Sequence, residues 1–179
     1  DAIKQLEENG IEVIVGKNVF SNTEGYCGTI EEKIDDIYKV SKQVKYIICA
    51  TGGINSNNIL RKLDYNKIKD NIFIGNSNPI LLFNALYSIN KQLSFIGPNI
   101  KTIGKSKSQF MIDCLIDILK EDNKIRTEES NIIINKGTAK GIAYGGNIQS
   151  LRRILGTKYF PIVDNSIVYL EADPTETNH

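Results

Sequence analysis

Short apolar runs alternate with amphipathic stretches along the first hundred residues of the chain. Residues 2–9 have a polar helical pattern that stops at Gly10, and the apolar run at residues 11–15 predicts a strand. Thr29 and Glu32 have the spacing of a capping box, which predicts that a helix begins there. Further strands of the apolar kind that is buried on both faces are predicted at residues 46–50, 72–74 and 93–96, and helices at about residues 57–63 and 80–89.

Strands that alternate with helices are typical of a mainly parallel sheet with helices on both faces, so we expect an α/β fold. The pattern changes after residue 98 and predicts a helix at about residues 107–120, a charged stretch at 121–129, strands at 132–134, 139–144 and 166–170, and a short helix at about 148–155. We therefore expect an α/β N-terminal domain at residues 1–100, a helix and linker at 101–130, and the start of a second, β-rich domain at 131–179.

Composition narrows the classes of partner. The chain has 22 basic and 21 acidic side chains among 179 residues, which gives no general reason to expect a nucleic acid or an anionic membrane surface. No apolar run approaches the ~18 residues of a membrane span, and no signal peptide opens the chain. Three cysteines without a CxxC pair, and a single histidine at position 179, argue against a disulfide framework and a metal site. We expect a cytoplasmic protein with no metal and no cofactor.

The best local candidate for chemistry is the turn that follows the predicted strand at 72–74. Pro79 suits the first position of the next helix, and Asn78 suits its N-cap. Ser77 would then lie at a strand-to-helix turn, with its hydroxyl above the carboxyl edge of the sheet and beside a helix N-terminus. This arrangement has the logic of a nucleophile elbow, although the same pattern is also typical of plain helix capping.

Two glycine-rich turns and one acidic residue are weaker candidates. Gly52 and Gly53 follow the predicted strand at 46–50, where a backbone without side chains can approach a ligand or add an N–H to an oxyanion hole. Residues 145–147 form a third predicted strand-to-helix turn, with Asn147 as the cap. Glu171 ends the last predicted strand and could orient a histidine for general-base work. Tight turns and an exposed strand-end carboxylate are the ordinary alternatives.

Together these features resemble the serine peptidase family of LD-carboxypeptidases, which includes muramoyltetrapeptide carboxypeptidases and microcin C immunity proteins. The resemblance follows the order and approximate spacing of that family over most of the chain. It covers residues 25–29, 51–98 with the Leu-Asp-Tyr of 63–65, 145–147, 155–161 and 170–171.

The resemblance implies a Ser-His-Glu triad that spans two domains, an α/β N-terminal domain and a C-terminal domain containing a β-barrel. Ser77 matches the family's nucleophile and Glu171 its charge-relay glutamate. Four further candidates are the oxyanion-hole N–H groups of Gly53 and Asn78 and the substrate contacts Gly52 and Asn147. The implied partner is a small peptide or peptide-conjugate substrate, with a homodimer possible and neither nucleic acid nor membrane involved.

The chain departs from the family at three places. Asn78 stands where Asp is usual, and Pro79 stands where a small hydroxylated residue is common. The family's histidine lies well beyond the glutamate, and His179 is too close to Glu171 in sequence to take its role. The family's first strand, upstream of residues 2–9, is absent. We therefore expect a fragment that is nearly inactive alone, because a serine hydroxyl is a poor nucleophile without a base.

Two substrates and two other classes of function remain open. One substrate is the L,D peptide bond before a terminal D-alanine in murein peptides, and the other is the acyl or carboxamide link of a peptidyl-nucleotide antibiotic. Residues 156–161 are closer to the immunity-protein branch, whereas residues 120–131 contain no aromatic side chain to stack on a nucleobase. The alternative to an enzyme is a non-catalytic, degenerate binding module that keeps the cleft. A nucleotide-binding domain that uses Gly52 and Gly53 is weaker, because no GxGxxG or GxxxxGK[ST] spacing occurs.

Overall fold

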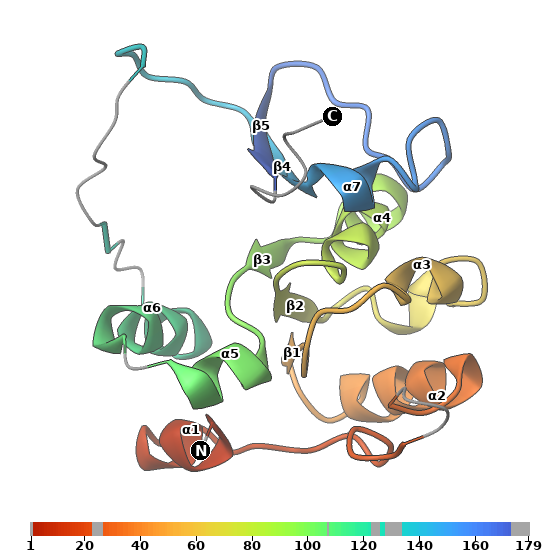
Figure 1. Ribbon diagram of the computed structural model, residues 1–179, viewed down its shortest axis with the longest axis vertical. Coiled ribbons are helices and arrows are strands. Elements are labelled where there is room, and N and C mark those ends of the chain that lie inside the picture. Colours follow the sequence, from red (N-terminus) through yellow and green to blue (C-terminus); the bar gives the residue numbers. More distant parts are fainter. Residues whose placement is uncertain (1, 23–26, 107, 123–125, 128–133, 173–179) are drawn as a thin grey trace.

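The computed structural model in Figure 1 describes residues 2–22, 27–106, 108–122, 126–127 and 134–172. At its centre is a three-stranded parallel sheet in the order β1 (Tyr46–Ile48), β2 (Ile72–Gly75) and β3 (Ser94–Ile96). A second, two-stranded parallel sheet consists of β4 (Ile142–Asn147) and β5 (Ser166–Glu171). The helices are α1 (Ala2–Glu8), α2 (Ile30–Ser41), α3 (Ser56–Ile59), α4 (Ile80–Asn90), α5 (Ile100–Lys105), α6 (Gln109–Leu119) and α7 (Ile148–Leu151), with a 3-10 turn at Tyr65–Lys67.

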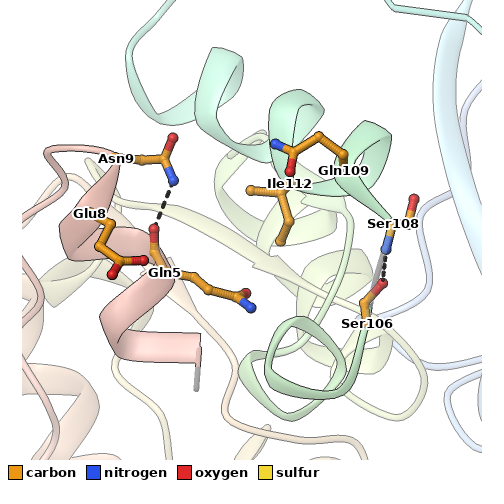
Figure 2. Close-up of a pocket in the computed structure, with 7 residues that line it drawn as sticks. All are labelled: Gln5, Glu8, Asn9, Ser106, Ser108, Gln109 and Ile112. Carbon is orange, nitrogen blue, oxygen red and sulfur yellow. Dashed lines mark hydrogen bonds between the residues drawn. The ribbon is translucent and has the colours of Figure 1, made fainter.

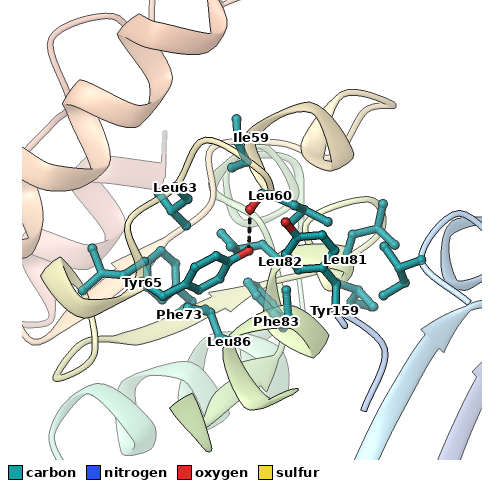
Figure 3. Packing of buried hydrophobic residues seen from close by; sticks show 14 of the residues in the cluster. Ile59, Leu60, Leu63, Tyr65, Phe73, Leu81, Leu82, Phe83, Leu86 and Tyr159 are labelled. Carbon is teal, nitrogen blue, oxygen red and sulfur yellow. Dashed lines mark hydrogen bonds between the residues drawn. The ribbon is translucent and has the colours of Figure 1, made fainter. Parts of the chain in front are cut away.

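Helices cover both faces of the central sheet. Successive side chains of a strand point to opposite faces, and β2 shows this with two fully buried neighbours. Phe73 packs into a cluster with side chains of α2, α3, α4 and α7, whereas Ile74 packs into another with side chains of α1, α5 and α6. Figure 3 shows the first cluster, in which the Tyr65 hydroxyl donates a hydrogen bond to the Leu60 carbonyl at 3.0 Å. The predicted α/β fold is confirmed.

Local signals set the first two helices as predicted. Gly10 has a φ of 79° immediately after α1, which ends the helix in the left-handed conformation that glycine adopts readily. At the start of α2 the Glu32 N–H donates to the Thr29 hydroxyl at 3.2 Å, and the Thr29 N–H donates to the Glu32 carboxylate at 2.7 Å. Both halves of the predicted capping box are therefore present.

The strand predicted at residues 11–15 is wrong. These residues join neither sheet among the described strands. Ile11 and Val13 instead pack against the cluster of α1, α5 and α6, while Ile14 and Val15 are exposed. The prediction that all three central strands are buried on both faces is correct for β2 only. β1 and β3 are the edges of the described central sheet and keep partly exposed side chains.

Several element boundaries also differ from the predictions. The helix predicted at 57–63 ends at Ile59, the one predicted at 148–155 ends at Leu151, and α5 was not predicted. Gly145 and Gly146 lie inside β4 rather than in a turn. A Cβ at Gly145 would stand 1.8 Å from the Tyr169 carbonyl oxygen, so the approach of β5 requires glycine there. The predictions at residues 25–26 and 132–133, and His179, lie outside the described residues.

The second sheet is anchored to α4, the helix that follows β2 (Figure 1). The Asn84 side chain donates to the Gly145 carbonyl at 2.9 Å, and a Cβ at Gly146 would lie only 2.2 Å from Ile80. The Tyr159 ring also stacks on Tyr65 with 6.4 Å between centroids. These contacts place the carboxyl ends of β4 and β5 near the start of α4. None of the helices in the described part of the chain is long and apolar enough to span a bilayer.

Candidate active site

The turn between β2 and α4 presents Ser77 to solvent. Its φ of 68° is in the left-handed region, which is uncommon for a residue with a side chain. The Ser77 N–H donates to the Asn76 side chain at 2.5 Å, and none of the described residues forms a hydrogen bond with the Ser77 hydroxyl. A strained, exposed serine at a strand-to-helix turn has the geometry of a nucleophile elbow.

Asn78 does not cap α4, contrary to the sequence prediction. The N-cap position is Pro79, one residue later, and α4 has no side-chain cap. Asn78 is instead only 2% exposed, and its Oδ1 accepts the Ser56 N–H at 2.6 Å. This hydrogen bond ties the Ser77 turn to the start of α3. It also satisfies the buried Asn78 side-chain oxygen, which would otherwise have accepted an N–H of α4.

The loop after β1 runs directly against Ser77. A Cβ at Gly52 would lie 2.9 Å from both Cβ and Oγ of Ser77, so only glycine leaves room for the serine. Gly53 has a φ of 141°, which a side chain rarely allows. Within the described chain, no group accepts a hydrogen bond from the N–H of Gly53 or of Asn78. The N–H groups of the residues that follow Ser77 and Gly52 therefore have no partner among the described residues.

Asn147 and Glu171 form a second group at the carboxyl ends of β4 and β5. They are partners in the strand register. The Asn147 Oδ1 accepts the Ser150 N–H at 3.0 Å and caps α7, as predicted. Glu171 Oε2 is buried, and no described residue supplies a hydrogen bond to it. No hydrogen bond among the described residues joins this group to Ser77, and the packing of Gly146 on Ile80 of α4 links the two.

The thiol nearest to this turn is not a competing nucleophile. Cys49 lies under the turn, since a Cβ at Gly75 would be 2.9 Å from the Cys49 Cβ. Burial raises the pKa of the Cys49 thiol to about 12, which keeps it protonated and unreactive. The residues that the structure describes contain no group of three His, Cys, Asp or Glu side chains that could hold a metal ion.

A surface pocket lies elsewhere, between α1 and the start of α6 (Figure 2). Its lining residues are Gln5, Glu8, Asn9, Ser106, Ser108, Gln109 and Ile112. None of the residues singled out from the sequence lines this pocket, so it does not belong to the site around Ser77.

Two residues that support the site were missed in the sequence. Arg153 Nη1 donates to the Ile54 carbonyl at 2.9 Å and so ties the loop after Gly53 to the end of α7. Asn99 holds the backbone of Asn76 with its side chain. Asn99 could have been found, because it follows a predicted strand and the carboxyl ends of parallel strands share one edge of a sheet. Nothing in the sequence indicates the contact of Arg153.

Comparisons with known proteins agree on the family. The profile of the LD-carboxypeptidase N-terminal domain matches residues 1–97. The chain is 28% identical to the "Probable murein peptide carboxypeptidase" of Bacillus subtilis, covering 95% of this chain and 56% of that protein. It is 26% identical to the microcin C7 self-immunity protein MccF of Escherichia coli, covering 94% of this chain and 59% of that protein. The crystal structure of an MccF-like protein from Bacillus anthracis superposes with a TM-score of 0.84 at 27% identity, covering 96% of this chain and 60% of that one. The chain thus spans little more than half the length of these relatives.

Proposed function

The chain belongs to the LD-carboxypeptidase family of serine peptidases, and from this premise we propose that it carries the nucleophile and the charge-relay carboxylate of a hydrolase that acts on murein peptides. One observation supports the proposal above the others. Ser77 is exposed in a left-handed turn at the carboxyl end of β2 and packs against Gly52, and the N–H groups of the next residues, Asn78 and Gly53, have no described partners. Plain helix capping needs none of these three features.

In the proposed reaction the Ser77 oxygen attacks the carbonyl carbon of the scissile amide and loses its proton to a general base. The carbonyl oxygen gains the negative charge and accepts hydrogen bonds from the N–H groups of Gly53 and Asn78. Collapse of this tetrahedral intermediate expels the amine of the leaving residue, which takes up a proton. Water then releases the acyl group from Ser77.

Glu171 is the proposed partner of the general base. Its buried Oε2 has no donor among the described residues, and an unsatisfied buried carboxylate oxygen is costly. An imidazole N–H would satisfy it and would be held in the correct tautomer. The resemblance implies a family histidine well beyond Glu171, outside residues 1–179, as the proposed general base. Asn147, the register partner of Glu171, is proposed to bind substrate through its amide nitrogen.

Murein peptides are the proposed substrate rather than a peptidyl nucleotide. Residues 120–131 contain no aromatic side chain, and a nucleobase is usually held by stacking on one. The relative from Bacillus subtilis is named for a murein peptide, whereas MccF is named for immunity to microcin C7.

Two substrates and one variant test the proposal. The gene product that contains these residues is assayed for release of the terminal D-alanine from a murein tetrapeptide, and for cleavage of an aspartyl sulfamoyl adenosine, a compound bound by MccF in a solved structure. We expect turnover of the tetrapeptide, and its loss in Ser77→Ala with substrate affinity within about tenfold of the unmodified protein. Wild-type turnover by Ser77→Ala would remove Ser77 as nucleophile. Cleavage of the adenosine compound alone would reassign the substrate. Binding of the tetrapeptide without any turnover would favour the non-catalytic module.

A further inference from the structure

Asn99 occupies an N-cap position but does not use its side chain as a cap. Asn is among the best N-cap residues because its side chain normally accepts an N–H of the first helical turn. At the start of α5 no such bond exists. The N–H of Ile100 donates instead to the Cys49 carbonyl, and that of Lys101 to the Ala50 carbonyl, both at 3.0 Å. The carbonyls of the two residues that follow β1 thus accept the first two N–H groups of α5, and the Asn99 side chain is left available.

The Asn99 side chain clamps the residue that precedes Ser77. Its Oδ1 accepts the Asn76 N–H at 3.2 Å, and its Nδ2 donates to the Asn76 carbonyl at 3.3 Å. The side chain is buried, with 6% of Asn99 exposed. Both backbone groups of Asn76 are therefore fixed by one side-chain amide, which belongs to the segment between β3 and α5.

The two hydrogen bonds from the Asn99 side chain, called the clamp, hold the residue next to a strained one. Ser77 is held at a φ of 68°, a conformation that costs free energy for any residue with a Cβ. Such a conformation persists only when the surrounding structure enforces it. On one side of Ser77 the enforcing contact is the Asn99 clamp, and on the other it is the bond from the Ser56 N–H to Asn78. Without the clamp, peptide rotation at Asn76 would let Ser77 relax.

We infer that Asn99 is a positioning residue, whose side chain keeps Ser77 in the left-handed conformation and thereby aims its hydroxyl at the substrate carbonyl. The effect on catalysis rests on the proposed function of Ser77. The effect on the conformation of Ser77 does not, and the two can be measured separately.

The variant Asn99→Ser tests catalysis, because serine keeps the N-cap preference of α5 but is too short to clamp Asn76. In the gene product that contains these residues we expect kcat for the murein tetrapeptide to fall on the order of 10²-fold, as for an ångström of misplacement of a reacting group, with KM within about threefold. Should Asn99→Ser not fold, Asn99→Asp retains the acceptor for the Asn76 N–H, and a smaller fall in kcat is expected. An unchanged kcat in a folded variant would overturn the inference when Ser77→Ala is inactive in the same assay.

Asn71 provides a matched control at the opposite end of β2. It is 5% exposed, and its Nδ2 donates to the carbonyls of Ser41 at 2.9 Å and Val44 at 2.7 Å. Asn71→Ser therefore removes a comparable buried amide that bonds to the backbone. We expect it to lower the melting temperature but to leave kcat within about threefold. Equal falls in kcat for the two variants would mean that Asn99 acts only through stability.

A double-mutant cycle in thermal unfolding measures the coupling without any assay of activity. Glycine adopts a φ of 68° without strain, so removal of the clamp in the Ser77→Gly background loses two hydrogen bonds and relieves no strain. In the unmodified protein the relaxation of Ser77 returns part of that loss. We therefore expect Asn99→Ser to lower the melting temperature more in the Ser77→Gly background than in the unmodified protein, whereas Asn71→Ser lowers it equally in both. Equal shifts for Asn99→Ser would refute the positioning role even if Ser77→Ala is inactive. Coupling together with an active Ser77→Ala would instead refute only the proposed function.

Discussion

Replacing Gly52 by alanine tests the contact on which the whole site depends. The added Cβ would stand 2.9 Å from both Cβ and Oγ of Ser77. Carbon atoms in contact normally lie about 3.5–4.0 Å apart, so the two segments must separate by about 0.6–1.1 Å. The Ser77 Cβ is fixed to its backbone and cannot rotate away, so the displacement falls on the turn itself.

The expected magnitude follows from that displacement. Overpacking of this kind costs about 1–3 kcal/mol in the free energy of unfolding. Moving a nucleophile by about 1 Å costs on the order of 10²-fold in rate, which corresponds to ~2.7 kcal/mol in the activation barrier. We therefore expect Gly52→Ala to lower kcat about a hundredfold while the protein remains folded.

The assay is release of D-alanine from a murein tetrapeptide, with thermal unfolding measured in parallel. Gly137→Ala is the control, because a Cβ there meets nothing within 4 Å, and neither kcat nor the melting temperature should change. Since both close atoms belong to the Ser77 side chain, the loss of stability should largely disappear in the Ser77→Gly background. A folded Gly52→Ala enzyme with kcat within about threefold of the unmodified protein would refute the argument.

Three other predictions concern the carboxylate, the base and the buried thiol. Glu171→Gln should reduce kcat by up to about 10⁴-fold, because an amide cannot stabilise the imidazolium that forms. As a control, Glu12→Gln at an exposed position should change the free energy of unfolding by no more than about 0.5 kcal/mol. A folded Glu171→Gln enzyme with kcat close to wild type would remove Glu171 from the triad. We expect only trace turnover of the tetrapeptide, and weak labelling by a fluorophosphonate probe, when residues 1–179 are assayed alone. The reason is that the one histidine of this polypeptide, His179, is not the proposed general base. Robust turnover would make His179 the base. Cys49 should resist alkylation at pH 8 in the folded protein while the exposed Cys27 reacts, and equal labelling of both cysteines in native protein by mass spectrometry would contradict the burial of the Cys49 thiol. The contribution of Cys49 to stability should be lost as the pH rises from 9.0 towards 12, because the thiol ionises first in the unfolded chain.

Those parts of the fold that depend on short-range physics were predictable from the sequence. The capping box of Thr29 and Glu32 and the glycine stop at Gly10 are each complete within four residues, so the pattern determines the structure. The run at residues 11–15 failed because a strand also needs a partner, and an apolar pattern does not reveal whether one is present. Ile11 and Val13 satisfy the same apolar pattern by packing beneath helices.

The site divides in the same way. A serine between an apolar strand and an apolar helix indicated the turn, and glycines after the preceding strand indicated the close approach of Gly52. The hydrogen-bond partners of the Asn78 and Asn99 side chains could not be predicted, because a local rule assigns both residues to helix capping. In the structure both bond to backbone of other segments, Asn78 to Ser56 and Asn99 to Asn76. Buried N–H and C=O groups of distant segments need hydrogen-bond partners, and satisfying them here outweighs the preference of Asn for the helix N-cap.

The bond of Asn78 bears on whether the departures from the family remove the chemistry. The acceptor for the Ser56 N–H is a side-chain oxygen, which Asp and Asn both possess, so Asn78 keeps the link between the Ser77 turn and α3. Pro79 has a φ of −51° in the right-handed region, which proline adopts without strain, so it continues the turn into α4. What is lost relative to the family is one negative charge beside the nucleophile, and an oxyanion hole requires N–H groups rather than that charge. The departures at Asn78 and Pro79 are therefore compatible with the turn around Ser77 and its N–H groups, and by themselves they do not argue for a degenerate binding module.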